Sequence, residues 1–329
     1  MAIIAFFMDY VKIKVNYTIS YGFHYSQELI KKIAEVLSSY CTANCQLFST
    51  HTNRFTFYLK EYHDKDELII FSNTIVDILK SILIVEGIGV GLGILEIDNN
   101  EFDVDQILKN VLIASENALN KPNRYYNYTF FDKDMELKIL RKMKIKNLLE
   151  QIANGDDSNI YMQFQPIVDI KLNCIYSFEA LARIKSDESD IISPVEFIPI
   201  AEETKLIFPV GKRIIYHSLS FLNKLKAKGY DFVNISINVS AIQLLKDDFN
   251  SYLLEILDNM GIEPGNLTIE ITESMFSDQY FEINNKIGEL KDSGIKIAID
   301  DFGTGYSSFS RIRELKVNSL KIDKSFINK

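Results

Sequence analysis

The segment that most constrains the fold lies near the C-terminal end, where Ile295–Ser308 reads IKIAIDDFGTGYSS. The run Ile295–Ile299 is apolar except for Lys296, and it ends in the adjacent carboxylates Asp300 and Asp301. Its length and apolar character favour a strand that is covered on both faces. Two neighbouring carboxylates there repel each other and lose hydration, so they need a positive partner, which is usually a divalent metal. The segment therefore predicts a metal site at the carboxyl end of a sheet or barrel.

Length and charge narrow the class of protein. A chain of 329 residues favours two domains. The net charge of −9 argues against a polymer of DNA or RNA as partner, although metals can neutralise a small phosphate ligand. Three cysteines are too few for a disulfide framework and indicate free thiols in a reducing compartment. The apolar stretch Ala2–Met8 is too short to span a bilayer, so we expect no membrane segment and a cytoplasmic location.

The first 120 residues alternate between strand-like and helix-like patterns. The expected elements follow the order βαββαβα, over Phe6–Tyr17, Ser26–Tyr40, Gln46–Ser49, Arg54–Glu61, Glu67–Val85, Gly87–Glu96 and Val104–Leu119. This order predicts a small α+β domain, residues 1–120, with a mainly antiparallel sheet. Four alternate glycines, Gly87, Gly89, Gly91 and Gly93, lack the lysine of a phosphate-binding loop and favour a closely packed strand instead.

Residues 121–159 form a predicted linker between the domains. The segment begins polar and rich in tyrosine, and Asp132–Ile152 then reads as one charged amphipathic helix that ends before Asn154 and Gly155. Two interpretations stay open: a connector that transmits a signal, and a passive spacer.

From residue 160 the chain alternates between strands and helices. The expected strands are Tyr161–Asp169, Ile175–Arg183, Phe232–Val239, Leu267–Thr272, Ile295–Ile299 and Ser319–Ile322. The expected helices are Pro194–Thr204, Val210–Lys228, Phe249–Met260, Gln279–Ser293 and Ser307–Leu315. Such alternation predicts parallel βα units, and hence a barrel or a doubly wound sheet.

Several of these strands carry one polar residue that a buried strand should not contain. They are Glu179, Asn238, Glu270, Asp300 with Asp301, and Lys321. Any one of them alone would be an ordinary solvent-facing position, as we expect for Lys296. Their repetition from strand to strand favours convergence at one end of a barrel. Carboxylate and amide oxygens suit Mg²⁺ or Mn²⁺ rather than Zn²⁺.

The residues from Ile160 onwards resemble the EAL family of cyclic-di-GMP phosphodiesterases. Glu179-Ala180-Leu181 forms the signature tripeptide within FEALAR, and Gln165 begins a QPI motif. The motifs PVEFIPIAEET, INVSA, EITES, DDFGTGYSS and LKIDKSFI follow in the family's order. A lone EAL tripeptide is weak, whereas several ordered motifs are specific.

The resemblance implies a TIM-like barrel with an atypical first strand that opens cyclic-di-GMP to linear pGpG by two-metal hydrolysis. The implied ligands of Mg²⁺ or Mn²⁺ are Glu179, Asn238, Glu270, Asp300 and Asp301, with Asp300 bridging to the second metal. The implied catalytic residues are Glu179, Asp300, Asp301 and Lys321, where Lys321 holds the water or the developing charge. The implied substrate-binding residues are Gln165, Arg183 and Glu273, with Glu273 anchoring the glycine-rich loop after Asp301.

The first 120 residues bear a weaker resemblance to the GGDEF, or diguanylate cyclase, fold. The hairpin where that motif belongs reads His51-Thr52-Asn53-Arg54-Phe55, without the glycines that let the backbone approach a phosphate. We therefore expect a degenerate GGDEF-like domain without cyclase activity. A regulatory module, a dimerising module and a remnant all remain open, and so does a homodimer.

The chain ends at Lys329, after the sixth of the eight strands that the resemblance implies. The fold class expected is therefore α/β, an incomplete TIM-like barrel over 160–329 that lacks its last strands, preceded by the α+β domain. The second metal is expected to lack a carboxylate, and hydrolysis by the chain as written is expected to be impaired. The alternative function is a non-catalytic module that binds cyclic-di-GMP or a protein partner.

Overall fold

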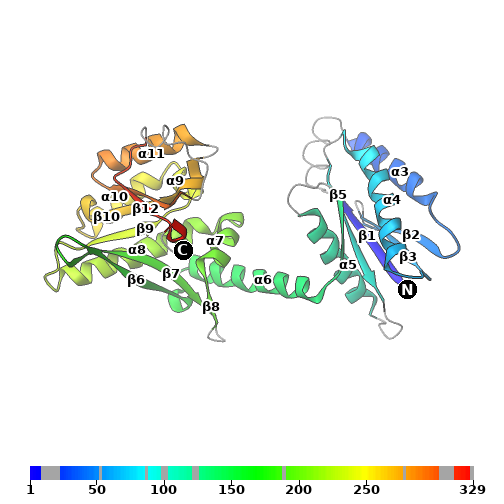
Figure 1. The fold of residues 1–329 in the computed structure, drawn as a ribbon, viewed down its shortest axis with the longest axis horizontal. Helices are drawn as coiled ribbons and strands as arrows, with labels where there is room; N and C mark the ends of the chain where they lie inside the picture. Colours follow the sequence, from blue (N-terminus) through cyan, green and yellow to red (C-terminus); the bar gives the residue numbers. More distant parts are fainter. Residues whose placement is uncertain are drawn as a thin grey trace. The chain divides into compact units, whose positions relative to one another are not determined.

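The structure is a computed structural model that describes residues 1–8, 23–51, 54–85, 88–97, 103–120, 126–186, 190–276, 279–303 and 315–326. The chain folds into two compact units, Met1–Arg141 and Lys142–Lys329 (Figure 1). Among the described residues, no helix is both long and apolar enough to cross a membrane. Cys41, Cys45 and Cys174 are all free thiols.

The N-terminal unit is built on a five-stranded sheet. Its strands lie in the order β2 (Cys45–His51), β3 (Arg54–Leu59), β1 (Ala2–Met8), β4 (Val90–Glu96) and β5 (Tyr126–Phe130). The first four strands pair in antiparallel fashion, and only β5 runs parallel to its neighbour β4. The prediction of a mainly antiparallel α+β unit is thus confirmed.

In the described part of this unit, three helices cover the sheet on its two faces. Helices α3 (Phe23–Ser38) and α4 (Lys65–Leu83) lie side by side over one face, and α5 (Val104–Leu119) lies on the other (Figure 1). Helices α4 and α5 each bury an apolar stripe, as an amphipathic sequence requires. Asp64 starts α4 by accepting a hydrogen bond from the Glu67 backbone N–H at 3.0 Å, so the helix begins where its capping residue stands.

The alternate glycines of β4 let α5 approach the sheet. A Cβ at Gly91 would lie 2.6 Å from the backbone nitrogen of Leu119, and one at Gly93 would lie 2.6 Å from that of Ser115. Because backbone atoms cannot move away cheaply, only glycine fits at these two positions. The predicted close packing of this strand is confirmed at Gly91 and Gly93, while Gly87 lies outside the described residues.

Strand β5 was not expected, because its residues fall in the predicted linker. Its sequence, YNYTF, is polar and only Thr129 is buried, so no apolar pattern marked it as a strand. It pairs along β4, and the Tyr126 hydroxyl donates to the Ile88 carbonyl at 2.8 Å. The predicted connecting helix is present as α6 (Lys133–Ala153). Of the predicted strand Phe6–Tyr17, residues 9–17 lie outside the description, and β1 begins earlier, at Ala2.

The C-terminal unit contains one mixed sheet. Its strands lie in the order β12 (Ser319–Ile322), β11 (Lys296–Phe302), β10 (Leu267–Thr272), β9 (Asn234–Asn238), β7 (Cys174–Lys185) and β6 (Ile160–Asp169), with the short β8 (Ile191–Ile192) beside β7. Strands β7, β9, β10, β11 and β12 are parallel, and β6 and β8 run antiparallel to β7. The family resemblance implied an atypical first strand, and β6 is atypical because it runs antiparallel to its neighbour β7.

The helices of the described part that connect and cover these strands are α7 (Pro194–Glu203), α8 (Ile207–Lys226), α9 (Ala241–Leu244), α10 (Phe249–Asn259) and α11 (Tyr280–Asp292). They pack on the outer face of the sheet, where Ile237, Ile269 and Ile297 belong to the largest apolar core. The helix predicted over Ser307–Leu315 falls almost entirely outside the described residues.

The inner face of the same sheet is polar. Side chains alternate along a strand, so Ser236 and Asn238 lie opposite to Ile235 and Ile237. On β10, Glu270 likewise separates the buried isoleucines at 269 and 271. In an ordinary parallel barrel this inner layer is filled by branched aliphatic side chains. The sequence alternation therefore sends the apolar set to the helices and leaves the polar set for the site described below.

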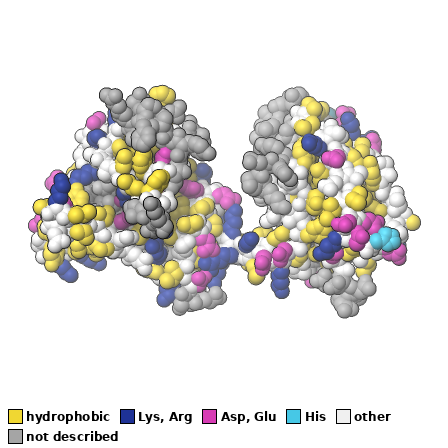
Figure 2. Space-filling view, in the orientation of Figure 1, with side chains coloured by type: hydrophobic (Ala, Val, Ile, Leu, Met, Phe, Trp, Pro, Cys, Tyr) yellow, Lys and Arg dark blue, Asp and Glu magenta, His cyan; other side chains and the backbone are white. Residues whose placement is uncertain are grey.

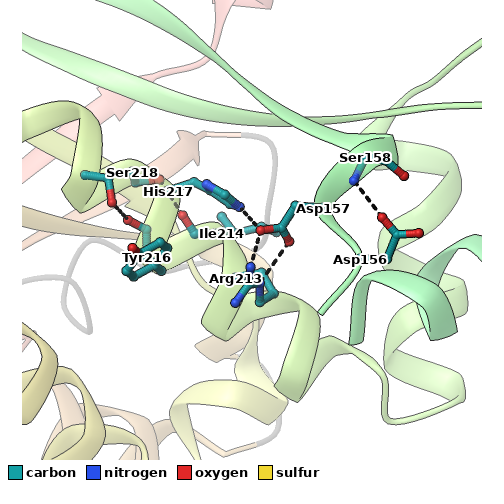
Figure 3. Close-up of polar contacts among 9 residues, drawn as sticks. Asp156, Asp157, Ser158, Arg213, Ile214, Tyr216, His217 and Ser218 are labelled. Atoms are coloured by element: carbon teal, nitrogen blue, oxygen red, sulfur yellow. Dashed lines mark hydrogen bonds and ion pairs between the residues drawn. The ribbon is translucent and has the colours of Figure 1, made fainter. Parts of the chain in front are cut away.

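A charged cluster fixes the beginning of the first strand (Figure 3). Asp157, in the turn before β6, accepts hydrogen bonds from both Arg213 Nε at 2.9 Å and Arg213 Nη2, and it lies 2.9 Å from His217 Nε2. Both partners lie on α8, one turn apart. The hydrogen bonds from Arg213 hold the pKa of Asp157 below its usual range. The cluster therefore fastens the entry of the sheet to its covering helix.

Candidate metal centre

Five polar side chains come from neighbouring parallel strands, four from the carboxyl half of their strand and Glu179 from the middle of β7. Glu179 lies on β7, Asn238 on β9, Glu270 on β10, Asp300 on β11 and Lys321 on β12. In the register of the sheet, Glu270 pairs with Asn238, and Asp300 pairs with the residue two places after Glu270. Because parallel strands end at one edge, their polar residues meet there.

Three carboxylates gather at this edge. The ligand atoms of Glu179, Glu270 and Asp300 all lie within 4.8 Å of one another. Asn238 Nδ2 donates to Glu179 Oε1 at 3.1 Å, which orients that carboxylate. The set offers hard oxygen donors, so it fits Mg²⁺ or Mn²⁺ rather than a softer metal.

Lys321 contacts all three carboxylates. Its Nζ lies 2.6 Å from Glu270 Oε2, 2.9 Å from Glu179 Oε2 and 3.1 Å from Asp300 Oδ1. One ammonium faces three carboxyl groups, which leaves the cluster with an excess of negative charge when all are ionised. Such an excess attracts a further cation, which is what a divalent metal site requires.

Burial and charge shift the proton affinities of this cluster. Glu270 is only 1% exposed, and this burial raises its pKa to about 7, although Lys321 acts in the opposite direction. Burial would lower the pKa of Lys321, but the hydrogen bond and charge of Glu270, followed by those of Glu179, outweigh it and raise that pKa. The lysine therefore stays charged.

Asp301 stands beside this cluster and does not belong to its group of three. Its backbone is left-handed, with φ of 52°, a conformation that aspartate adopts more readily than most residues. Burial, followed by the charges of Asp300 and Asp323, raises the pKa of Asp301. Among the described residues, the close carboxylate group therefore holds one aspartate of the pair, and the other expected ligand, Asp301, is not part of it.

Glu273 connects the end of β10 to the loop after β11. It is 5% exposed, and its Oε2 accepts a hydrogen bond from the Gly303 backbone N–H at 2.8 Å. Gly303 has a φ of +102°, a backbone conformation that residues other than glycine rarely adopt. A buried carboxylate and a glycine turn therefore hold the start of the DDFGTG loop, while residues 304–314 of that loop lie outside the described residues.

A cavity of about 650 Å³ opens over the carboxylates. Its polar floor includes Glu179, Asn238, Glu270 and Asp300, and its walls are mainly apolar, with Leu181, Pro194, Ile198 and Met275 among them. This volume lies within the range of small-ligand pockets, and apolar walls around a few convergent polar groups are typical of them. In Figure 2, acidic and basic side chains are interspersed on the drawn face of each unit.

Two expected substrate-binding residues lie apart from this lining. Gln165 is exposed on β6, opposite Glu179 in the antiparallel register. Arg183 follows Glu179 on the same face of β7, and its Nη1 donates to the carbonyl of Ala182 at 2.9 Å. Neither is among the residues that line the described cavity. Both lie on strands that carry or adjoin site residues. Because neither lines the cavity, their roles in substrate binding stay predictions.

Sequence reasoning missed the residues that form the cavity wall beyond the strand ends. Gln243, on the short helix after β9, is 6% exposed and lines the cavity. A signal was present, since Ser240 and Gln243 have the spacing of a helix start directly after Asn238. The apolar wall residues of α7 gave no such signal, because an apolar helix position usually indicates core.

Similarity to known proteins agrees with this geometry. The EAL domain family matches residues 145–329. The cyclic di-GMP phosphodiesterase PA2567 of Pseudomonas aeruginosa is 28% identical over 238 residues, covering 72% of this chain and 40% of its own length. A solved structure of the PaMucR phosphodiesterase in complex with c-di-GMP is 30% identical, with a TM-score of 0.52 over 55% of this chain and 74% of that one.

A third likeness extends over nearly the whole chain. The Vibrio cholerae LapD structure, which comprises an S helix, a GGDEF and an EAL part, covers 99% of this chain and 76% of its own, with a TM-score of 0.51. At 16% identity this likeness concerns the fold alone. The chain spans less than half the length of the curated relatives that it matches first. The matched family covers more than half of the chain, and the chain therefore belongs to the EAL-domain family.

Proposed function

We propose that this protein is a cyclic-di-GMP phosphodiesterase that opens the cyclic dinucleotide to linear pGpG. The observation that carries the proposal is the cluster of Glu179, Glu270 and Asp300 within 4.8 Å, at the floor of a cavity large enough for a ligand. The relative PA2567 is named a cyclic di-GMP phosphodiesterase, which supports the same substrate.

We propose the roles of the residues from their positions. Glu179, Asn238, Glu270 and Asp300 would hold Mg²⁺ or Mn²⁺, and Asp301 is proposed as a further ligand toward a second ion. A bound divalent cation lowers the pKa of water and so supplies hydroxide near neutral pH. Lys321 would orient that water or stabilise negative charge on the phosphate, because its ammonium already faces the carboxylates at 2.6 to 3.1 Å.

The remaining predicted residues would act on the dinucleotide and the loop. We assign Gln165 and Arg183 to the ligand, since Gln165 lies opposite Glu179 and Arg183 follows it on β7, and arginine forms paired hydrogen bonds with phosphate or guanine. Glu273 would hold the loop start through Gly303.

A second candidate function is a module that binds cyclic-di-GMP without hydrolysing it. The observation that favours it is the contact of Lys321 with all three carboxylates, because this ammonium already offsets part of their charge. In that case the cluster would be stable without a metal, and the affinity for cyclic-di-GMP would not depend on added metal.

We further propose that the N-terminal unit, predicted over residues 1–120 and completed in the structure by β5, is a degenerate GGDEF-like domain without cyclase activity, joined through α6 to the EAL domain. The fold likeness to LapD supports this assignment, and so does the β2–β3 hairpin, where Arg54 occupies the position of an acidic residue. Free Cys41 and Cys174, both exposed, are consistent with a cytoplasmic location. A homodimer is kept as a proposal for solution measurements.

The deciding experiment combines turnover with binding. The purified chain is incubated with cyclic-di-GMP and Mn²⁺ or Mg²⁺, and linear pGpG is separated by chromatography. Metal-dependent pGpG formation supports the phosphodiesterase. Calorimetric binding of cyclic-di-GMP without turnover supports the second candidate, and the absence of both would contradict the two proposals together.

A further inference from the structure

Helix α8 contains a buried glycine, Gly211, at a position where the backbone conformation does not require glycine. Gly211 lies inside Ile207–Lys226, and its φ is not in the left-handed region that favours glycine. Glycine in a helix interior costs about 1 kcal/mol relative to alanine, so its presence asks for another reason. A Cβ at this position would overlap the carboxamide nitrogen of Gln243 and come within 3.2 Å of its Cδ. The helix therefore leaves space for one particular side chain.

Gln243 uses this space to reach the turn after β9. Its Oε1 accepts a hydrogen bond from the backbone N–H of Ser240 at 3.2 Å. With only 6% of its surface exposed, Gln243 is held between the backbone of Gly211 and the turn. A side chain at position 211 would overlap the carboxamide in this place, so we expect it to displace the group that accepts from that N–H.

The turn that Gln243 holds carries groups of the metal centre. Ser240 follows Asn238 by two residues, and Asn238 donates to Glu179 at 3.1 Å. Between them, the Val239 N–H donates to the carbonyl of Glu270 at 3.0 Å. A displacement of the turn would therefore reach a proposed amide ligand directly, the carboxylate of Glu179 through its hydrogen bond with Asn238, and the backbone of Glu270.

We propose that Gln243, seated on Gly211, is a positioning residue for the metal centre: it fixes the Asn238–Ser240 turn and thereby the oxygen donors that bind the divalent cation. The inference rests on the proposed metal-dependent function and adds a residue pair outside the strand ends. Partners that orient metal ligands typically change metal affinity by about 10- to 100-fold when they are removed.

Gly211→Ala tests this seat without endangering the fold. The added Cβ meets the far end of a flexible side chain, and alanine is the better helix former, so we expect no loss in thermal midpoint. The displaced carboxamide should raise the Kd for Mn²⁺ about 10-fold, measured by calorimetry on the full chain. The Ser240 amide should also lose protection in hydrogen exchange, with or without metal.

A double-mutant cycle tests whether Gly211 acts through its contact with Gln243 or through the stability of the helix. Gln243→Ala should weaken Mn²⁺ binding by a similar factor, and the double variant G211A/Q243A should be no weaker than Q243A, because the carboxamide that the added methyl group would displace is gone. Gly288→Ala is the matched control: it lies in the interior of α11, and the three atoms nearest to its Cβ would all belong to the flexible side chain of Lys316, with Nζ at 2.6 Å. This control should bind Mn²⁺ like the wild type.

The outcomes distinguish the inference from the function on which it rests. If the wild type binds Mn²⁺ and the variants at 211 and 243 bind it equally well, the positioning role is wrong and the metal site stands. If the two substitutions weaken binding additively, the seat is wrong. If the wild type binds no Mn²⁺, the proposed function falls and the positioning role falls with it.

Discussion

The two sheets of this protein treat their faces differently. The N-terminal sheet has helices on both faces, and the buried polar residues described in its unit, such as Thr56 on β3 and Asn110 on α5, are all uncharged. The C-terminal sheet packs helices against its outer face and leaves a polar inner face that carries the buried Glu270, and Glu273 is buried in the turn directly after β10. A buried carboxyl group is unfavourable unless it is paired, so its presence indicates a use beyond packing.

This difference also separates the two kinds of glycine. Gly91 and Gly93 serve packing, because helix backbone lies directly against them. Gly303 serves a turn at the end of β11, beside the carboxylate cluster. The N-terminal unit therefore uses glycine to close its core, and the C-terminal unit uses it to shape a loop at a site.

The largest effect is expected where the buried acids lie. Glu270→Gln removes one of three carboxylates from the group within 4.8 Å, and it should weaken Mn²⁺ binding by about 100-fold or more. Calorimetry measures this, and pGpG formation should fall at least as much. The matched control is Glu136→Gln in the N-terminal unit, whose carboxylate pairs with Lys109 at 2.7 Å. Equal losses in both variants would erase the distinction between the two sheets.

The converse substitution addresses packing. Gly91→Ala forces a Cβ against the backbone of α5, and overpacking of this kind costs about 1–3 kcal/mol. Hydrogen exchange should show lower protection in β4 and α5, while the Kd for Mn²⁺ stays at the wild-type value. A change in metal affinity of about tenfold or more, equivalent to about 1.4 kcal/mol, would mean that the site depends on the core of the N-terminal unit.

The sequence predicted the parts of the fold that carry a periodic apolar pattern. Val104–Leu119, Leu267–Thr272 and Ser319–Ile322 match the structure residue for residue. Strand β5 escaped prediction because its stability comes from pairing with β4 rather than from apolar alternation.

The candidate site shows the same division. The strand-end acids were recognisable because each interrupts a buried strand, and parallel strands bring such positions together. The separation of Asp301 from the close carboxylate group was not, since it depends on a left-handed backbone at that one residue. Gln243 was missed because its contact with Gly211 joins two helices that are distant in sequence.

A smaller effect is expected at the Asp157 cluster, which is charged and stands outside the site. Asp157→Asn should lower the free energy of unfolding by about 1 kcal/mol at pH 7, because Arg213 loses its ionised partner. The folded-state pKa of Asp157 is lowered, so its stabilisation is present above the unfolded value of about 3.9 and is lost as pH falls through the folded value. Urea unfolding at pH 7 and at pH 3 should show the difference shrinking with acid. A difference that is the same at both would contradict the ion pair.

The smallest effect is expected for Lys296→Met, which tests whether any charged side chain on the inner face belongs to the site. Lys296 and Asp300 lie on the same face of β11, toward its two ends, and Lys296 Nζ donates to the Tyr176 hydroxyl at 3.2 Å. This lysine is partly exposed and its described hydrogen bond goes to a neutral hydroxyl, so Lys296→Met should change the free energy of unfolding by less than about 0.5 kcal/mol and leave Mn²⁺ binding unchanged. Lys321→Met removes the ammonium from three carboxylates and should lower stability clearly in metal-free buffer, with Mn²⁺ restoring part of the loss. If the two methionine variants lost equal stability and responded equally to Mn²⁺, contact with the three carboxylates would not be what distinguishes Lys321 from Lys296.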